Sequence, residues 1–209
     1  MQEQQDRGVE RANTITHAIG VAASVLGGAG LIVLAALRGT AWDVVGVSVF
    51  AGTLILLYTA STAYHAARHP VVRVRLKVLD HCAIYLLIAG SYTPFTIGGL
   101  RGGWGWSLFG VIWGLAVAGV VFKFFFTGRF RLVSTGIYVA MGWLVLIAAG
   151  PMLTRLAPIT LAWLLAGGIA YTAGTPLYHA TRLRYSHALW HLFVLAGSAC
   201  HAVAVATAI

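Results

Sequence analysis

The segment SHALWHLFVLAGSACHA, residues 186–202, places three histidines in an otherwise apolar run. His187 and His191 are four residues apart, so a helix puts both imidazoles on one face, where they can bind one metal ion. His201 lies beyond His191 by about 15 Å along a helix axis, which is too far to join the same site. The spacing therefore predicts a two-histidine metal-binding face, with His201 as a buried histidine that hydrogen-bonds between helices.

Two other apolar runs carry polar side chains that suit the same chemistry. Ser61 and His65 are also four residues apart, and Asp80 stands at the beginning of a later run. A further histidine would give a three-histidine site with a fourth position open for water or substrate, which is typical of catalytic zinc. Sulfur ligands are not expected, because Cys82 and Cys200 have no partner at metal-ligand spacing.

The composition shows which elements must position these residues. Of the 209 residues, 59% are hydrophobic and only 9% are charged, whereas about a quarter of a soluble domain is charged. Apolar stretches near the roughly 20 residues that a membrane helix needs occur over seven ranges: 15–37, 43–65, 79–98, 104–126, 132–150, 158–179 and 188–208. We therefore expect an all-α fold with one seven-helix transmembrane domain over residues 15–209, after a short polar cytoplasmic segment, residues 1–14.

Arginine and lysine residues set the expected orientation, because cytoplasmic loops are enriched in them. With a cytoplasmic N-terminus, that side holds eleven of them: Arg7, Arg11, Arg68, Arg73, Arg75, Lys77, Lys123, Arg129, Arg131, Arg182 and Arg184. The other side holds Arg38, Arg101 and Arg155. We therefore expect the N-terminus inside and the C-terminus outside. A basic rim beside anionic lipid headgroups explains the net charge of +9, so nucleic acid is not expected as a partner.

This orientation brings most of the histidines to the cytoplasmic side. His65 ends the second expected helix, Asp80 begins the third, and His187 and His191 begin the seventh. A single histidine at a membrane interface is more typical of an amphipathic anchor than of a metal ligand, and three are interpreted in that way: His17, His69 and His81. The convergence of the other three histidines at one depth, with Ser61 and Asp80 beside them, favours a metal site.

Four segments have motifs that are found together in a known family. They are ERANTITHAIG (10–20), STAYH (61–65), LDHCAIYLLIAGSYTPF (79–95) and HALWHLFVLAGSACH (187–201). They resemble the hemolysin III-related proteins, the bacterial branch of the progestin and adipoQ receptor family, which includes the adiponectin receptors. The wider superfamily includes alkaline ceramidases, which hydrolyse a lipid amide. The resemblance covers the whole chain and implies a multi-pass protein of the bacterial plasma membrane.

The resemblance also implies roles for individual residues. The family's three zinc ligands match His65, His187 and His191. Asp80 matches the acidic residue near the metal, and Ser61 matches the serine of the motif on the second helix. Glu10 and His17 belong to the N-terminal motif, to which the resemblance gives no role. Because only a short segment precedes the first expected helix, unlike in the receptors, a protein hormone is not expected as a partner.

These features predict a zinc-dependent hydrolase that acts on a lipid amide or ester near the cytoplasmic leaflet, with membrane lipids as its partners. Zinc lowers the pKa of a bound water and polarises a carbonyl group. Asp80, bound to the metal directly or through water, would orient or deprotonate that water. Ser61 would hydrogen-bond the water or a developing oxyanion.

The sequence leaves three alternatives to a hydrolase. A membrane-homeostasis or signalling protein could use zinc only to hold the second and seventh helices together, without turnover. A cytolysin is a less favoured alternative, because the expected helices carry few polar residues and no charged ring. An ion-coupled transporter is also less favoured, because His201 is a single deep histidine and no pair of broken helices is evident.

Overall fold

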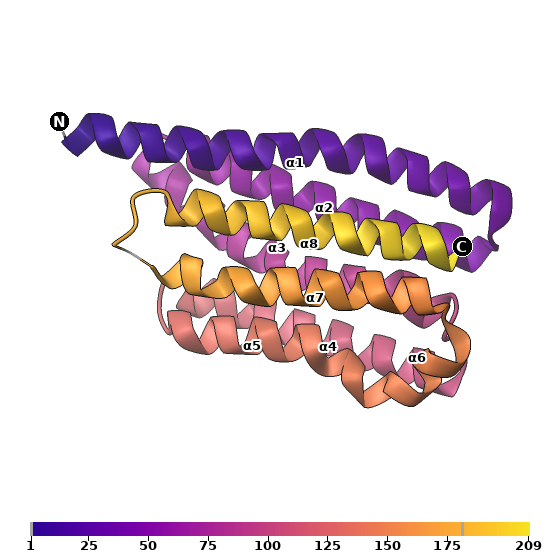
Figure 1. Cartoon of the computed structure of the whole chain (residues 1–209). Helices are drawn as coiled ribbons and strands as arrows, with labels where there is room; N and C mark the ends of the chain where they lie inside the picture. Colours follow the sequence, from indigo (N-terminus) through magenta and orange to yellow (C-terminus); the bar gives the residue numbers. More distant parts are fainter. Residues whose placement is uncertain (1, 181) are drawn as a thin grey trace.

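The computed structural model describes the backbone of residues 2–180 and 182–209, and this part of the chain is almost entirely helical (Figure 1). The helices in chain order are α1 (Gln2–Arg38), α2 (Ala41–Ala66), α3 (Pro70–Ile97), α4 (Gly103–Phe126), α5 (Arg131–Trp143), the 3-10 helix η1 (Leu144–Ala148), α6 (Ala149–Arg155), α7 (Pro158–His179) and α8 (Ser186–Ala208). The described residues include no strand. The expected all-α class is confirmed.

Five helical segments in the described part of the chain are long and apolar enough to cross a membrane. They are Arg7–Arg38, Ala41–Ala66, Gly103–Phe126, Arg131–Arg155 and Ser186–Ala208. The fourth of these combines α5, η1 and α6. Helices α3 and α7 have 28 and 22 residues and do not belong to this set, because polar and small residues lower their mean hydropathy. The chain therefore has several membrane-spanning helices.

Three helix boundaries differ from the sequence expectation. α1 begins at Gln2, so most of the polar segment 1–14 continues the first membrane helix instead of preceding it. α3 begins at Pro70, because proline is favoured in the first turn of a helix, where its missing N–H costs nothing. The expected helix 132–150 changes to a 3-10 turn at Leu144. Pro151 lies in the first turn of the α6 helix that follows, where it breaks no hydrogen bond.

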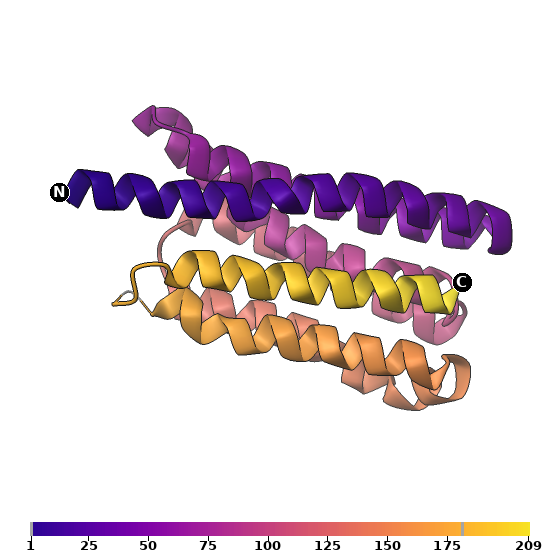
Figure 2. The same ribbon diagram turned by 45° about the horizontal axis from the view of Figure 1, so that its top comes forward.

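The helices pack as neighbours around a closed bundle. α1 contacts α2 and α8, α2 contacts α3, α3 contacts α4, and α7 contacts α8. α5 contacts α3 and α7. Both views show α8 between α1 and α7 (Figures 1 and 2). The first and last helices of the chain are therefore side by side, and residues far apart in the sequence meet at the helix ends.

The two ends of the bundle differ in charge. The N-terminus of α1, the α2–α3 and α4–α5 turns and the α7–α8 loop lie at one end, and the C-terminus lies at the other (Figure 1). The first end, named here the basic end, carries most of the arginines and lysines, including Arg73, Arg129 and Arg131. At the other end, Asp43 forms a capping box with Thr40 at the start of α2, so its role is structural.

Polar groups are inside and large apolar groups are outside, as in a protein that faces lipid. Leu26, Leu37 and Phe125 are exposed at 74%, 78% and 75%. In contrast, Ser61 and His191 are exposed at only 1% and 2%. An ionisable or polar group inside a membrane protein faces other helices or a cavity, because exposure to hydrocarbon is costly. The interior is therefore the place to look for chemistry.

Close contact between α2 and α3 depends on glycine. A Cβ atom added at Gly46 would lie 2.8 Å from the backbone Cα of Pro94, a distance that requires one of the two helices to shift. A Cβ atom at Gly52, on the same helix, would meet nothing within 4 Å. Small residues let membrane helices approach in this way, and this contact sets the distance between α2 and α3 near the start of α2.

We expect Gly46→Ala to destabilise the protein by about 1–3 kcal/mol, because an added methyl group overpacks the contact with backbone atoms that cannot rotate away. Gly52→Ala is the matched control and is expected to raise stability by up to about 1 kcal/mol through helix propensity. Thermal unfolding of both variants in detergent micelles measures the difference. Equal melting temperatures for the two variants would contradict the assigned packing.

Candidate metal centre

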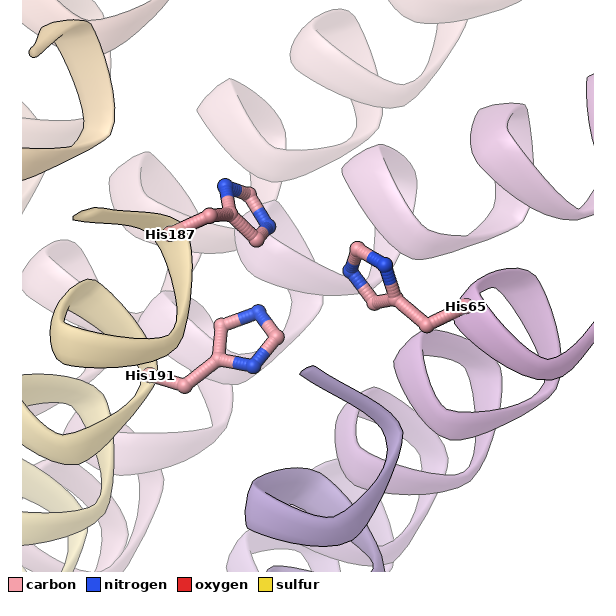
Figure 3. Close-up of side chains that lie close together, drawn as sticks. All are labelled: His65, His187 and His191. Atoms are coloured by element: carbon pink, nitrogen blue, oxygen red, sulfur yellow. The ribbon is translucent and has the colours of Figure 1, made fainter. Parts of the chain in front are cut away.

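Three histidines meet at the basic end of the bundle. His65 comes from the last turn of α2, and His187 and His191 come from the first two turns of α8. One ligand atom from each lies within 4.8 Å of those of the other two. Figure 3 shows the three imidazoles turned toward one another across the gap between the two helices. The residues that the sequence predicts as metal ligands are thus brought together.

Helix boundaries explain why these side chains converge. α8 begins at Ser186, so His187 and His191 are stacked one turn apart on the face of its first turns. α2 ends at Ala66, and Ala67 has extended backbone dihedrals, which stops the helix one residue after His65. The ring centroid of His65 lies 5.0 Å from that of His187 and 5.1 Å from that of His191. The three side chains therefore share one depth.

Glu10 on α1 holds His65 in one orientation. Its Oε2 atom lies 2.7 Å from His65 Nδ1, and its Oε1 atom accepts a hydrogen bond from the Arg73 guanidinium on α3. A carboxylate can only accept, so His65 donates from Nδ1 and keeps Nε2 as its free ligand atom. His65 Nε2 is buried and has no hydrogen-bond partner among the described residues. A carboxylate that orients a histidine in this way is common behind metal ligands.

Thr16, about two turns after Glu10 on α1, holds His191 in one orientation. Its Oγ1 atom lies 3.0 Å from His191 Nδ1 and 2.9 Å from the carbonyl oxygens of Ala12 and Asn13. Because the single hydroxyl proton is donated to the backbone, the oxygen accepts from His191 Nδ1–H. His191 then offers Nε2 as its ligand atom. The two tautomers are therefore set by one helix, α1.

His17 is part of this centre, and its interpretation as an interfacial anchor is wrong. It is only 4% exposed and stacks on His191, with ring centroids 3.5 Å apart and an interplanar angle of 14°. Tyr58 packs edge-on against its other side at 5.0 Å. Both ring nitrogens of His17 are buried without a partner among the described residues. His17 therefore fixes the plane of the His191 ring by stacking.

Asp80 and Ser61 lie beside the three histidines. Asp80 is 9% exposed and Ser61 is 1% exposed, and both line the same cavity as His187 and His191. Ser61 Oγ lies close to the Asp80 carboxylate and makes no hydrogen bond of good geometry with the described residues. A carboxylate and a hydroxyl therefore line the same cavity as two histidines of the cluster.

The remaining histidines are divided between structural and surface positions. His81 is buried, with Nδ1 3.1 Å from Asp80 Oδ2, so its interpretation as an interfacial anchor is wrong. His69 precedes α3 and is exposed, as expected of an anchor. His201 packs on the Tyr171 ring of α7 at 5.4 Å. It therefore lies between α7 and α8, as expected, but its Nδ1 atom is buried without a hydrogen-bond partner among the described residues.

A cavity of about 410 Å³, partly open to the outside of the bundle beside Leu146 and Leu153, leads from the centre into the bundle. At the basic end it is bounded by the centre itself, through Asp80, His187 and His191. Its far end is bounded by Leu100 and Met152, which belong to the opposite end of the bundle. Most of the lining between these ends is apolar, so the cavity suits a long apolar group with one polar end at the histidines.

The donor set fits a metal ion. Three neutral imidazoles from two helices match a catalytic zinc site, which has three protein ligands and an open fourth position. A buried ring nitrogen without a partner costs about 1–3 kcal/mol, and a metal ion would give His65 Nε2 its partner.

Sequence reasoning missed two residues of this centre, Thr16 and Arg73, and gave Glu10 no role. The helical spacing of residues in the N-terminal motif could have indicated that Glu10 lies on the same face of the first helix as His17. Glu10, Asn13 and His17 are spaced by three and four residues, which places them on one face if the first helix extends to residue 10. In the structure that face packs on the centre, and Asn13 is only 3% exposed.

Fold and site together define a multi-pass, all-helical membrane protein with a buried three-histidine cluster at one end of its bundle. A comparison with protein families identifies the group. The family described as Haemolysin-III related matches residues 6–202, and the chain belongs to it.

Relatives of known name support this assignment. The chain is 47% identical over 190 residues to Hemolysin-3 of Bacillus cereus, covering 91% of this chain and 87% of that protein. It is 46% identical over 190 residues to the Hemolysin-3 homolog of Bacillus subtilis, covering 91% and 89%. The human Monocyte to macrophage differentiation factor is 26% identical over 206 residues, covering 93% and 82%. The chain is thus a multi-pass bacterial membrane protein.

We expect Thr16→Val to weaken metal binding about tenfold, because His191 loses the oxygen that fixes its tautomer and ring orientation. Thr14→Val is the matched control. The Thr14 hydroxyl also donates to the α1 backbone, at Glu10, but no contact with a histidine is recorded for it. Equilibrium dialysis of both purified variants against a metal series measures the affinities. Equal affinities for the two variants would exclude the orienting role of Thr16.

Proposed function

We propose that the chain is a zinc-dependent hydrolase that acts on a lipid amide or ester near the cytoplasmic leaflet. The observation that supports this most strongly is the position of the histidine cluster at one end of an apolar cavity, with a carboxylate and a hydroxyl beside it. A structural metal site would be closed by four protein ligands. Here two histidines of the cluster, His187 and His191, line a cavity large enough for a ligand.

Zinc is the metal that this donor set suits best. Three imidazoles without sulfur or a second carboxylate match the borderline softness of zinc and its preference for tetrahedral sites. His65, His187 and His191 would hold the ion. Glu10 and Thr16 would act behind them by fixing the rings.

The residues around the ion have separate tasks in the proposed reaction. Zinc in such a site supplies an activated water and polarises a carbonyl. Asp80, which lines the cavity, would orient such a water and accept its proton. Ser61 would donate a hydrogen bond to the negative charge that develops on the carbonyl oxygen. The apolar walls exclude bulk water, which strengthens both interactions.

The cavity favours a membrane lipid as substrate. Its lining beyond the centre is formed by side chains such as Leu87, Val139, Leu164 and Val194. An acyl chain could lie along them while its amide or ester group reaches the histidines.

The proposal includes a topology of seven membrane spans, with α3 and α7 crossing the membrane beside the five more apolar segments. The basic end faces the cytoplasm, because most arginines and lysines lie there. The N-terminus is then inside and the C-terminus outside. The proposed zinc site lies at the depth of the cytoplasmic leaflet.

We expect alkaline phosphatase, which is active only outside the cytoplasm, to be active when fused after Gly102 or after Ile209. The same enzyme fused after Gly128, in the α4–α5 turn, is expected to be inactive. Enzyme activity per fused protein, measured in intact cells, distinguishes the two groups. The reverse pattern would place the site at the outer leaflet.

We expect purified protein to contain one zinc per chain and His191→Ala to lose it, because two histidines alone hold zinc weakly. His69→Ala is the matched control, since His69 is an exposed histidine at the same end of the bundle. Elemental analysis of purified proteins measures the content. Wild-type protein without bound metal, after purification in zinc-containing buffer, would overturn the proposal.

Turnover separates the hydrolase from a membrane-homeostasis protein with structural zinc. We expect Asp80→Asn and Ser61→Ala to keep their zinc, and Asp80→Asn to lower hydrolysis of a ceramide about a hundredfold or more. The assay measures release of fatty acid from ceramides and lipid esters in liposomes.

A cellular bilayer phenotype that survives in both variants but is lost in His191→Ala would favour structural zinc. Lysis of erythrocytes by metal-free protein would favour a cytolysin instead.

A further inference from the structure

His201 lines the cavity but has no task in the proposed reaction. It shares the cavity wall with His187 and His191, and it lies about 15 Å farther along the axis of α8 than His191. Its Nδ1 atom is buried and has no hydrogen-bond partner among the described residues. A buried nitrogen without a partner destabilises a folded protein, so this histidine needs an explanation.

Other buried polar atoms without partners lie at the basic end of the same cavity. Among the described residues that line it, they belong to His17, Ser61 and His81. His17 stacks on His191, and the other two stand beside Asp80. These atoms belong to the surroundings of the histidine cluster. The unpartnered nitrogen of His201 is a separate feature, because it lies deeper in the bundle.

The polar side chains near His201 already have partners. Tyr171, whose ring packs against the imidazole, has its hydroxyl oxygen 2.8 Å from Ser198 Oγ. Thr172, the next residue on α7, accepts a hydrogen bond from Trp143 Nε1 at 3.0 Å. A partner for the imidazole must therefore come from outside these side chains. The cavity that the imidazole lines is the space that can hold one.

Two glycines make room for the rings between α7 and α8, which lie side by side (Figures 1 and 2). A Cβ atom added at Gly167 on α7 would lie 2.6 Å from His201 Nε2, and one added at Gly197 on α8 would lie 2.7 Å from the Tyr171 ring. Each ring thus fills a notch in the opposite helix. An apolar side chain of similar size would fill the same notch without an unpaired nitrogen, so packing alone does not account for a histidine.

We propose that His201 is a second polar contact for the ligand of the cavity, and that it selects a lipid whose acyl chain carries a hydroxyl group about 15 Å from its carbonyl group. This assignment rests on the proposed function, which places the carbonyl group at the histidine centre. It deepens that function by naming the class of acyl chain that the cavity prefers.

A hydroxyl group is the partner that best suits a neutral imidazole in apolar surroundings. The neutral ring has one N–H donor and one acceptor nitrogen. A hydroxyl group both donates and accepts, so it can bond Nδ1 of His201 in either tautomer, whereas a ketone oxygen only accepts. A charged group would be buried without a counter-charge. The cavity wall on α7 and α8 includes Leu164 and Val194, which suit the hydrocarbon part of the chain.

Ricinoleic acid and oleic acid test this preference, because they are the same unsaturated acid with and without one hydroxyl group in the second half of the chain. Displacement of fluorescent cis-parinaric acid from the purified full-length protein in detergent micelles gives both dissociation constants. Their ratio is compared between variants, so that partition of the acids into micelles cancels. We expect the preference for ricinoleic acid to be about tenfold stronger in the wild type than in variants without the imidazole, as for one hydrogen bond to a buried group.

Two variants remove the ring nitrogens of His201. His201→Phe keeps a ring in the notch, and His201→Leu keeps an apolar side chain, and both are expected to lose the preference. His201→Asn keeps a polar group near the position of Nδ1 and is expected to retain part of it. Thr207→Val is the matched control, because Thr207 also contacts α7 from α8, at 3.0 Å from Thr160 Oγ1, but does not line the cavity. It is expected to keep the wild-type ratio.

A second pair of acids tests the position of the hydroxyl group. In β-hydroxystearic acid the hydroxyl group lies beside the carboxyl group, and stearic acid lacks it. We expect the ratio for this pair to be the same in the wild type and in both apolar variants of His201. A ricinoleic acid preference that is unchanged in His201→Phe and His201→Leu would overturn the assignment, even if their melting temperatures fall, because that pattern is the one of a purely structural histidine. An equal loss of preference in Thr207→Val would also overturn it.

The same measurements separate this assignment from the proposed function. If the protein neither holds zinc nor hydrolyses ceramide, but both apolar variants of His201 lose the preference for ricinoleic acid, the hydrolase proposal fails and the hydroxyl contact stands. If zinc and ceramide hydrolysis are present but the preference is equal in the wild type and both variants, the hydroxyl contact fails and the hydrolase proposal stands.

Discussion

The hydrogen bond between the Glu10 carboxylate and His65 Nδ1 is the interaction on which the site depends. It connects α1 to the end of α2, and the Arg73 guanidinium on the other carboxylate oxygen adds α3 to the same junction. The Glu10 side chain is 35% exposed, and the donors on both of its carboxylate oxygens hold it in one orientation. Thr16 and His17 extend the junction to His191 on α8. Helix α1 therefore orders the two helices that carry the histidines.

The features that follow from local sequence could be predicted. Long apolar runs gave the helices, and the spacing of His187 and His191 gave one metal-binding face, because both depend on residues that are near one another in the chain. The resemblance of the motifs added His65 to the same centre. The sequence misplaced the starts of α1 and α3, because polar residues continue a helix beyond the membrane without any change of period.

Contacts between distant helices could not be predicted in the same way. Whether His17 is an anchor or a stacking partner depends on which face α1 turns toward α8, and one sequence without an alignment does not specify that rotation. The 3-10 segment at Leu144 and the shape of the cavity beside Val139 depend on how α5 packs against α7. These features result from side-chain packing in three dimensions, and they decide access to the site.

The two sides of the histidine cluster differ in polarity. At the basic end, charged and hydrogen-bonded groups from α1, α2 and α3 join at Glu10. The Glu10 and Arg73 side chains there are 35% and 33% exposed, so this side of the site is in contact with water. On the other side, the cavity beyond His187 and His191 is lined mostly by apolar side chains. The cluster therefore stands at a boundary between polar and apolar surroundings, a position that favours a ligand with one polar and one apolar end.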